Sequence, residues 1–262
     1  MLSVKVSKNG TTWNELTEAG GYQLIDVKGL NPPKANIITS PLVGLDGTEF
    51  QSTNLEQRNI VLTYRLKDTS SYDVEALRRA VYPLFPQDKN LWFRFKAGTK
   101  TYQIRGYVES INVDLFTDGE TMQISIICPS SYLQAITTKK AYLTAVDNYL
   151  AGAITNESDC SVGFTFHFTA VADIDKLYFN SAAGSFEVDS LVYNDNLVVC
   201  TIPLEKSVRI GAVNWLNNFS GDFFKLPVGY TSFTINCEDS IGQAIAGAGD
   251  GYVEITEIFR GI

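Results

Sequence analysis

The stretch from Ser70 to Leu133 constrains the fold more than any other part of the chain, because a short helix and several strands follow one another there with almost no loop. It reads SSYDVEALRRAVYPLFPQDKNLWFRFKAGTKTYQIRGYVESINVDLFTDGETMQISIICPSSYL and contains no catalytic pattern. Apolar residues recur at helical spacing after a Ser/Asp start and before two prolines, which predicts a helix of about three turns. Those apolar residues are Val74, Leu77, Val81 and Leu84.

Strand patterns surround this helix. Apolar and polar side chains alternate in Leu91–Lys96 and Met122–Cys128, which predicts half-buried strands. The alternation changes phase between Gly106 and Ser110, which predicts a bulge, and Asp118–Gly119 predicts a hairpin turn. Upstream strands are expected at Ser3–Val6, Gln23–Val27, Asn36–Thr39 and Asn59–Leu66.

The second half of the chain is nearly all β. Short strands at turn-punctuated intervals predict a β-sandwich. They are expected around Val162–Thr169, Lys176–Phe179, Phe186–Asp189, Leu197–Ile202, Thr231–Glu238 and Tyr252–Phe259. The length of 262 residues favours two domains, with one large β domain as the alternative. We expect a β-rich domain with one short helix at 1–133, a small and polar junction at 134–158, and the sandwich at 159–262.

The charge of the chain is unevenly distributed. Residues 1–133 hold 14 Lys and Arg against 14 Asp and Glu, whereas residues 134–262 hold 7 against 15. The acidic half is unsuited to nucleic acid, whose binding depends on neutralising phosphates. No apolar run approaches the roughly 20 residues of a membrane helix, and the N-terminus lacks the apolar segment of a signal peptide. We therefore expect synthesis in a cytoplasm, no membrane insertion and no sequence-specific binding of nucleic acid.

Candidate catalytic residues are isolated from partners. His167 is the single histidine, and no nucleophile elbow accompanies it. Carboxylates two residues apart on a predicted strand also occur on ordinary solvated faces. We expect no catalytic residue, cofactor or metal site, with incidental calcium binding at Asp173, Asp175 or Asp189 as the alternative. The acidic groups that could mimic a glycosidase pair are Asp114, Asp118 and Glu120, Asp173 and Asp175, and Glu187 and Asp189.

The four cysteines stand 32 to 40 residues apart, too far for a metal knuckle. Cys128, Cys200 and Cys237 fall in register with the apolar residues of predicted strands. Buried free thiols are therefore expected.

Three sets of residues are candidates for contacts with other molecules. Arg78 and Arg79 lie opposite the apolar stripe of the helix, where they form either a solvated face or a subunit contact. Pro32 and Pro33 suit an edge strand or arm, and we expect Gly20–Phe50 to be such an arm. Trp215 and Tyr230 belong to an aromatic-rich segment that could pack in the core, contact a protein or stack on sugar rings.

The order and spacing of several segments resemble the siphophage distal tail protein family. In the first half these are LDGTEF, the strand RNIVLTYRL, ALRRAVYPLF and the hairpins ending IICPSSYL. In the second half they are FFKLPVGYTSFTI and the closing strand GYVEITEIFRGI.

This resemblance implies a structural, non-enzymatic protein of the phage tail tip at the distal end of the tail in the virion. The N-terminal domain would form a hexameric ring, and the C-terminal domain would be a galectin-like or carbohydrate-binding-module-like sandwich. Implied partners are the tail tube protein, a tail-associated hub protein, and receptor-binding or baseplate proteins. The alternative is a host-surface carbohydrate-binding module on an oligomerising domain. The sequence HFTAV lacks the Asn and Arg that galectins place after their histidine.

Overall fold

The computed structural model describes residues 3–71, 73–114 and 120–262, which form two compact units. The first unit comprises Met1–Ile136 and Phe259–Ile262, and the second comprises Thr137–Ile258. The final residues thus return to the first unit, whereas we expected them to belong to the sandwich. Strands fill the range 134–158, where we expected a junction. The polar residues of this range lie on the solvent side of the strands. These strands bury few side chains, which include those of Ala141, Leu150 and Ile154.

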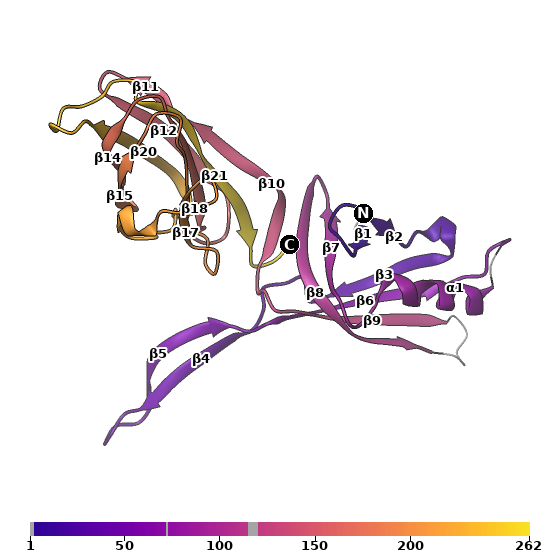
Figure 1. Ribbon diagram of the computed structural model, residues 1–262. Coiled ribbons are helices and arrows are strands. Elements are labelled where there is room, and N and C mark those ends of the chain that lie inside the picture. The colour runs from indigo at the N-terminus through magenta and orange to yellow at the C-terminus, as the bar shows by residue number, and fades with distance from the viewer. Residues whose placement is uncertain (1–2, 72, 115–119) are drawn as a thin grey trace. The chain divides into compact units, whose positions relative to one another are not determined.

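The first unit is a curled antiparallel sheet with one α-helix (Figure 1). Its strands run in the spatial order β2-β1-β7-β8-β9-β6-β3, and β4 and β5 form a separate hairpin. The strands are β1 (Ser3–Ser7), β2 (Asn14–Glu15), β3 (Tyr22–Lys28), β4 (Ala35–Pro41), β5 (Thr48–Leu55), β6 (Arg58–Leu66), β7 (Asn90–Ala97), β8 (Lys100–Val113) and β9 (Thr121–Cys128). A 3-10 turn, η1 (Glu18–Gly20), precedes β3.

Helix α1 (Val74–Val81) is shorter than the three turns expected. Asp73 caps it, and its carboxylate accepts a hydrogen bond of 2.8 Å from the Ala76 amide. The last expected turn is the 3-10 turn η2 (Tyr82–Leu84), which contains Pro83. Proline cannot donate the hydrogen bond that would continue the α-helix, so the helix tightens and ends there.

The predicted bulge is confirmed, because the register of β8 against β9 shifts between Val108 and Ser110. This bulge separates the half of β8 that pairs with β7 from the half that pairs with β9. The predicted hairpin between β8 and β9 is confirmed by their antiparallel pairing. Its turn residues, Asp118 and Gly119, lie outside the described residues.

The second unit is a sandwich of two antiparallel sheets, as predicted (Figure 1). One sheet has the order β18-β17-β16-β13-β21-β10, and the other has the order β11-β12-β20-β14-β15-β19. Strands β10 and β21 continue into the first unit. The strands are β10 (Leu133–Tyr142), β11 (Thr144–Val146), β12 (Tyr149–Asn156), β13 (Phe164–Ala170), β14 (Ile174–Ser181), β15 (Gly184–Leu191), β16 (Asn196–Cys200), β17 (Ser207–Ile210), β18 (Val213–Asn214), β19 (Phe219–Gly221), β20 (Gly229–Glu238) and β21 (Gly249–Phe259), with a 3-10 turn, η3 (Leu216–Asn218).

Aromatic side chains fill the space between the two sheets of the sandwich. Phe164, Phe166 and Phe168 alternate with polar residues on β13 and are buried, as the sequence pattern predicts. Phe179 of the opposite sheet lies 5.2 Å from the ring centre of Phe166 at an angle of 73°. Burial of such rings is the main stabilising contribution to a core of this kind. The fold is therefore mainly β, and no helix among the described residues is long and apolar enough to cross a membrane.

Candidate functional site

The arm, Ala35–Leu55, is the hairpin formed by β4 and β5. Ala35 pairs with Leu55 at its root, and Pro41 pairs with Thr48 near its tip. Among the described strands β4 and β5 pair only with each other, so both outer edges keep unpaired backbone groups. A lone two-stranded hairpin is at best marginally stable in water. The arm expected at Gly20–Phe50 therefore exists, but it begins later, because β3 belongs to the main sheet.

Exposed apolar side chains cover the arm. Ile37 is 61% exposed and Phe50 is 60% exposed. They lie on one face, because Ile37 and Thr39 share a side of β4 and Phe50 is the partner of Thr39 across a bulge. Further exposed apolar residues near the tip are Leu42, Val43 and Leu45. An uncovered apolar surface of this kind marks an interaction site.

Arg58 holds the root of the arm. It is 2% exposed, and its guanidinium donates to four backbone carbonyls that come from three parts of the chain. One terminal nitrogen reaches the carbonyls of Gly29 at 2.6 Å and Asn31 at 2.8 Å. The other reaches the carbonyls of Ser131, at 2.9 Å, and Arg260. Burial lowers the pKa of Arg58, and its acceptors in these bonds are neutral.

Pro32 and Pro33 lie beside this anchor. Pro32 is exposed and Pro33 is half-buried. A Cβ atom added to Gly261 would lie 2.8 Å from Cδ of Pro32, so the two backbones pass closely. The Ile262 amide also donates to the Leu30 carbonyl at 3.1 Å. The prolines thus border the end of their own chain, and a subunit contact through them stays a prediction.

Arg78 and Arg79 both bind Glu75 on the same helix. The Arg78 guanidinium lies 2.6 Å from the Glu75 carboxylate, and that of Arg79 lies 2.9 Å from it. Hydrogen bonds from Arg78 and then Arg79 hold the pKa of Glu75 below its ordinary value. Arg79 keeps 76% of its side chain exposed, whereas Arg78 keeps 22%. A subunit contact through either arginine stays a prediction.

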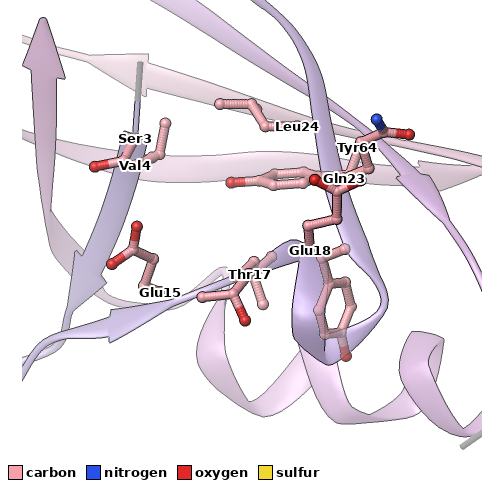
Figure 2. A pocket seen from close by; sticks show the side chains of 10 residues that line it. Ser3, Val4, Glu15, Thr17, Glu18, Gln23, Leu24 and Tyr64 are labelled. Carbon is pink, nitrogen blue, oxygen red and sulfur yellow. The ribbon is translucent and has the colours of Figure 1, made fainter. Parts of the chain in front are cut away.

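A pocket of about 220 Å³ lies between β1–β2 and β3, the two ends of the curled sheet (Figure 2). The ring of Tyr64 reaches into it from β6 (Figure 2). Burial raises the pKa of Tyr64, so its hydroxyl stays protonated. The carboxylates at the rim are ion-paired, Glu15 with Lys5 at 3.2 Å and Glu18 with Lys67 at 3.5 Å. The pocket can accept a polar group, but it brings together no nucleophile and base.

A second hollow, the aromatic groove, lies on the sandwich and has a volume of about 310 Å³. Tyr142 is 68% exposed at its rim, and its ring centre lies 5.6 Å from that of Tyr252. His167 stacks on Tyr252 at 4.5 Å, and partial burial lowers its pKa, so the imidazole is neutral at neutral pH. Asp250 and Thr169 complete the polar lining. We expected His167 to be a surface or cross-strand residue, and it pairs across the strands with Tyr252.

Trp215 and Tyr230, the expected sugar or partner contacts, lie apart from this groove. The Trp215 indole donates to the Asp189 carbonyl at 3.0 Å, and the ring packs against the sandwich core. Tyr230 is 72% exposed on β20, in the other sheet. A contact through either residue stays a prediction.

The acidic residues are used in local structure. Glu187 binds Lys176 at 2.6 Å, and Asp173 accepts a hydrogen bond from the Tyr193 amide. Asp114 accepts one from the Thr121 hydroxyl, while Asp118 lies outside the described residues. No group of three or more His, Cys, Asp or Glu able to hold a metal ion occurs in the described ranges.

The three cysteines expected to be buried thiols, Cys128, Cys200 and Cys237, are buried and free. Burial raises the pKa of Cys128 and of Cys237 to about 12. Both thiols are therefore protonated at neutral pH and unreactive as nucleophiles.

Sequence reasoning missed Arg58 and the aromatic groove. Arg58 begins a strand and reads as an ordinary polar residue, because its four acceptors are backbone carbonyls with no side-chain pattern. The groove joins Tyr142, His167 and Tyr252 from three strands that are far apart in sequence. Only the pairing of β10, β13 and β21 brings them together.

Comparison with solved structures shows which fold this is. SPP1 Dit, a protein described as a paradigm of the hub adsorption apparatus in phages that infect Gram-positive bacteria, matches with a TM-score of 0.68 at 12% identity over 99% of both chains. A chain of the phage P2 baseplate in its activated conformation matches with a TM-score of 0.52 at 9% identity over 100% of both chains. No protein-family model and no curated protein sequence matches. The chain therefore has the fold of these two phage proteins over its whole length.

Proposed function

We propose that this protein is a structural hub of a siphophage tail tip. In this proposal it forms a homo-hexameric ring that joins the tail tube to the baseplate or tail fibre and to host-recognition proteins. The fold shared with SPP1 Dit supports the tail-tip role, because that protein is described as a hub. The proposed location is the distal end of the tail in the virion.

The uncovered arm is the observation that most directly supports the proposed ring. Its open edges and its apolar residues, such as Ile37 and Phe50, are exposed in the single chain. A neighbouring subunit that covers the arm would pair the edges and bury those side chains. Repetition of one such contact around an axis closes a ring.

The proposed role is non-enzymatic and requires no cofactor. The tail tube protein, a tail-associated hub protein and receptor-binding or baseplate proteins are the proposed partners, with no membrane insertion and no sequence-specific binding of nucleic acid. The ion pair of Glu187 with Lys176 and the stacking of His167 on Tyr252 support a role in assembly rather than in hydrolysis.

The mass of the purified protein in solution tests the ring directly. We expect a six-subunit species that dissociates on dilution, because each contact would rest on one slender arm. Analytical ultracentrifugation across a concentration series, with electron microscopy of the assembled fraction, provides the measurement. A monomer at every concentration, or cleavage of peptidoglycan by the purified protein, would contradict the proposal.

A second candidate function is recognition of a saccharide, and the aromatic groove favours it. Tyr142 presents an exposed ring beside Asp250, Thr169 and the neutral His167. Aromatic faces stack on sugar rings, and neighbouring polar groups select hydroxyls. The acidic charge of this half of the chain favours an uncharged sugar over an anionic one. The aromatic groove thus becomes the candidate sugar site in place of Trp215, because the Trp215 indole nitrogen already donates to the Asp189 carbonyl in its own unit.

Tyr142→Ala tests this candidate. We expect binding of uncharged oligosaccharides such as cellotetraose, maltotetraose or chitotetraose to weaken about tenfold when the stacking ring is lost. Calorimetric titration or ligand-observed NMR provides the measurement, and Tyr193→Ala, which removes a similarly exposed tyrosine that does not line the groove, is the control. Absence of binding to all three sugars, or equal loss in both variants, would exclude the groove.

A further inference from the structure

A basic face lies on the outer side of β1, β7 and β8 in the first unit. The inward side chains of β7, Leu91, Phe93 and Phe95, are fully buried, so their neighbours point outwards. Strand pairing then places the outward residues next to one another. The basic face consists of Lys5, Trp92, Arg94, Lys96, Gln103 and Arg105.

The basic face has more cationic side chains than acidic ones. Four cations lie on it, and the carboxylate at its β2 edge is that of Glu15, which binds Lys5 at 3.2 Å. The first unit as a whole is nearly neutral, so this excess is a local feature.

Aromatic rings hold two of the guanidiniums in place. Arg94 lies 3.8 Å above the centre of the Trp13 ring, and Arg105 lies 4.9 Å above that of Trp92. Stacking of this kind fixes the direction of a cation while leaving its charge unpaired. The face therefore presents oriented positive charge beside aromatic surface.

The arm is acidic, in contrast to the basic face. Between Ala35 and Leu55 it contains Asp46 and Glu49 and no Lys or Arg. Its exposed Ile37 and Phe50 add apolar surface that could lie against Trp92. The arm and the basic face thus complement each other in charge and in polarity.

We propose that the basic face receives the acidic arm of a second copy of this chain. This inference rests on the proposed ring and names the surface that completes it. Arm and face are different surfaces of one chain, so the contact is heterologous, and repeating it head to tail generates a ring. An acidic protein segment suits the face better than DNA does, because the apolar Ile37 and Phe50 of the arm match the surface of Trp92, whereas a phosphate backbone offers charge alone.

Charge reversal on each side tests the proposal. We expect Asp46→Lys with Glu49→Lys, and separately Lys96→Glu with Arg105→Glu, to raise the concentration needed for half-assembly at least about tenfold. Combining all four substitutions should return it to within about threefold of wild type, because the charges again match. Sedimentation velocity over a concentration series measures this. Lys96→Gln with Arg105→Gln provides a milder version of the face variant.

Lys28→Glu with Lys89→Glu is the control, since it makes the same change of charge at exposed positions away from the face. If it weakens assembly as strongly as the face variant, or if the combined variant is not restored, the proposal is overturned. Rings that persist in both reversed pairs would overturn this contact and leave the proposed hub standing. A different result would identify the face as a nucleic-acid surface instead. In that case the protein would bind double-stranded DNA in a salt-sensitive way, and the face variant would lose this binding while its assembly stayed unchanged.

Discussion

The proposed rings will fail to form when the arm, Ala35–Leu55, is replaced by a short glycine-serine linker, while the rest of the chain keeps its fold. Ala35 and Leu55 are paired neighbours at the root, so a short linker spans the gap without moving either end. Within the described part of the chain, the arm shares no sheet with the other strands and buries almost nothing. Its loss should therefore change the free energy of unfolding by less than about 1 kcal/mol. Sedimentation and circular dichroism measure the two effects.

A finer variant separates the apolar face of the arm from its backbone edges. Ile37→Ser with Phe50→Ser keeps the hairpin, and we expect it to weaken assembly without disturbing the monomer. Leu204→Ser with Ile241→Ser is the matched control, because these residues are apolar and even more exposed, at 104% and 74%, on the other unit. Six-fold rings of unchanged stability after replacement of the arm would refute its role and leave the helix face with Arg78 and Arg79 as the next candidate.

Arg58→Met will destabilise the first unit by about 3–5 kcal/mol, because each buried carbonyl left without a donor costs about 1–3 kcal/mol and water can reach some of them. Methionine fills similar space, but four carbonyls from three segments lose their donor at once. Arg58→Lys should recover only part of the loss, because an ammonium cannot reproduce the planar fork. Urea unfolding in a Trp215→Phe background, where the remaining tryptophans lie in the first unit, measures the effect.

Arg65→Met provides the control for this measurement. Arg65 lies on the same strand, β6, and is exposed, so its replacement should cost no more than about 0.5 kcal/mol. Equal stability of the Arg58→Met and Arg65→Met variants would show that the four bonds contribute little.

The strands of this fold were predictable only where apolar and polar residues alternate along the sequence. Alternation identified β7, β9 and β13, because each has one face in a core and the other in solvent. It missed β10, whose residues are mostly exposed and therefore carry no such alternation. It also missed β5, because both faces of an uncovered arm are polar or mixed.

The candidate sites were less predictable than the strands. The arm was foreseen from its prolines, but its length depends on which strand β3 joins, and that pairing with β6 is long-range. The basic face required knowledge that β1 pairs with β7, since Lys5 is nearly ninety positions from Arg94 in sequence. Sites assembled by pairing between distant strands leave no local signal for a sequence reader.

The return of Phe259–Ile262 to the first unit has a consequence for the order of events during translation. The Arg58 guanidinium needs the carbonyl of Arg260, and Leu30 receives the Ile262 amide. Domains generally fold as units while the ribosome is still adding residues. Here the sandwich can be completed before the first unit, even though most of the first unit emerges earlier. A chain that stalls before residue 259 would thus carry an arm with a loosened root, and the proposed ring would admit only subunits whose synthesis has passed that point.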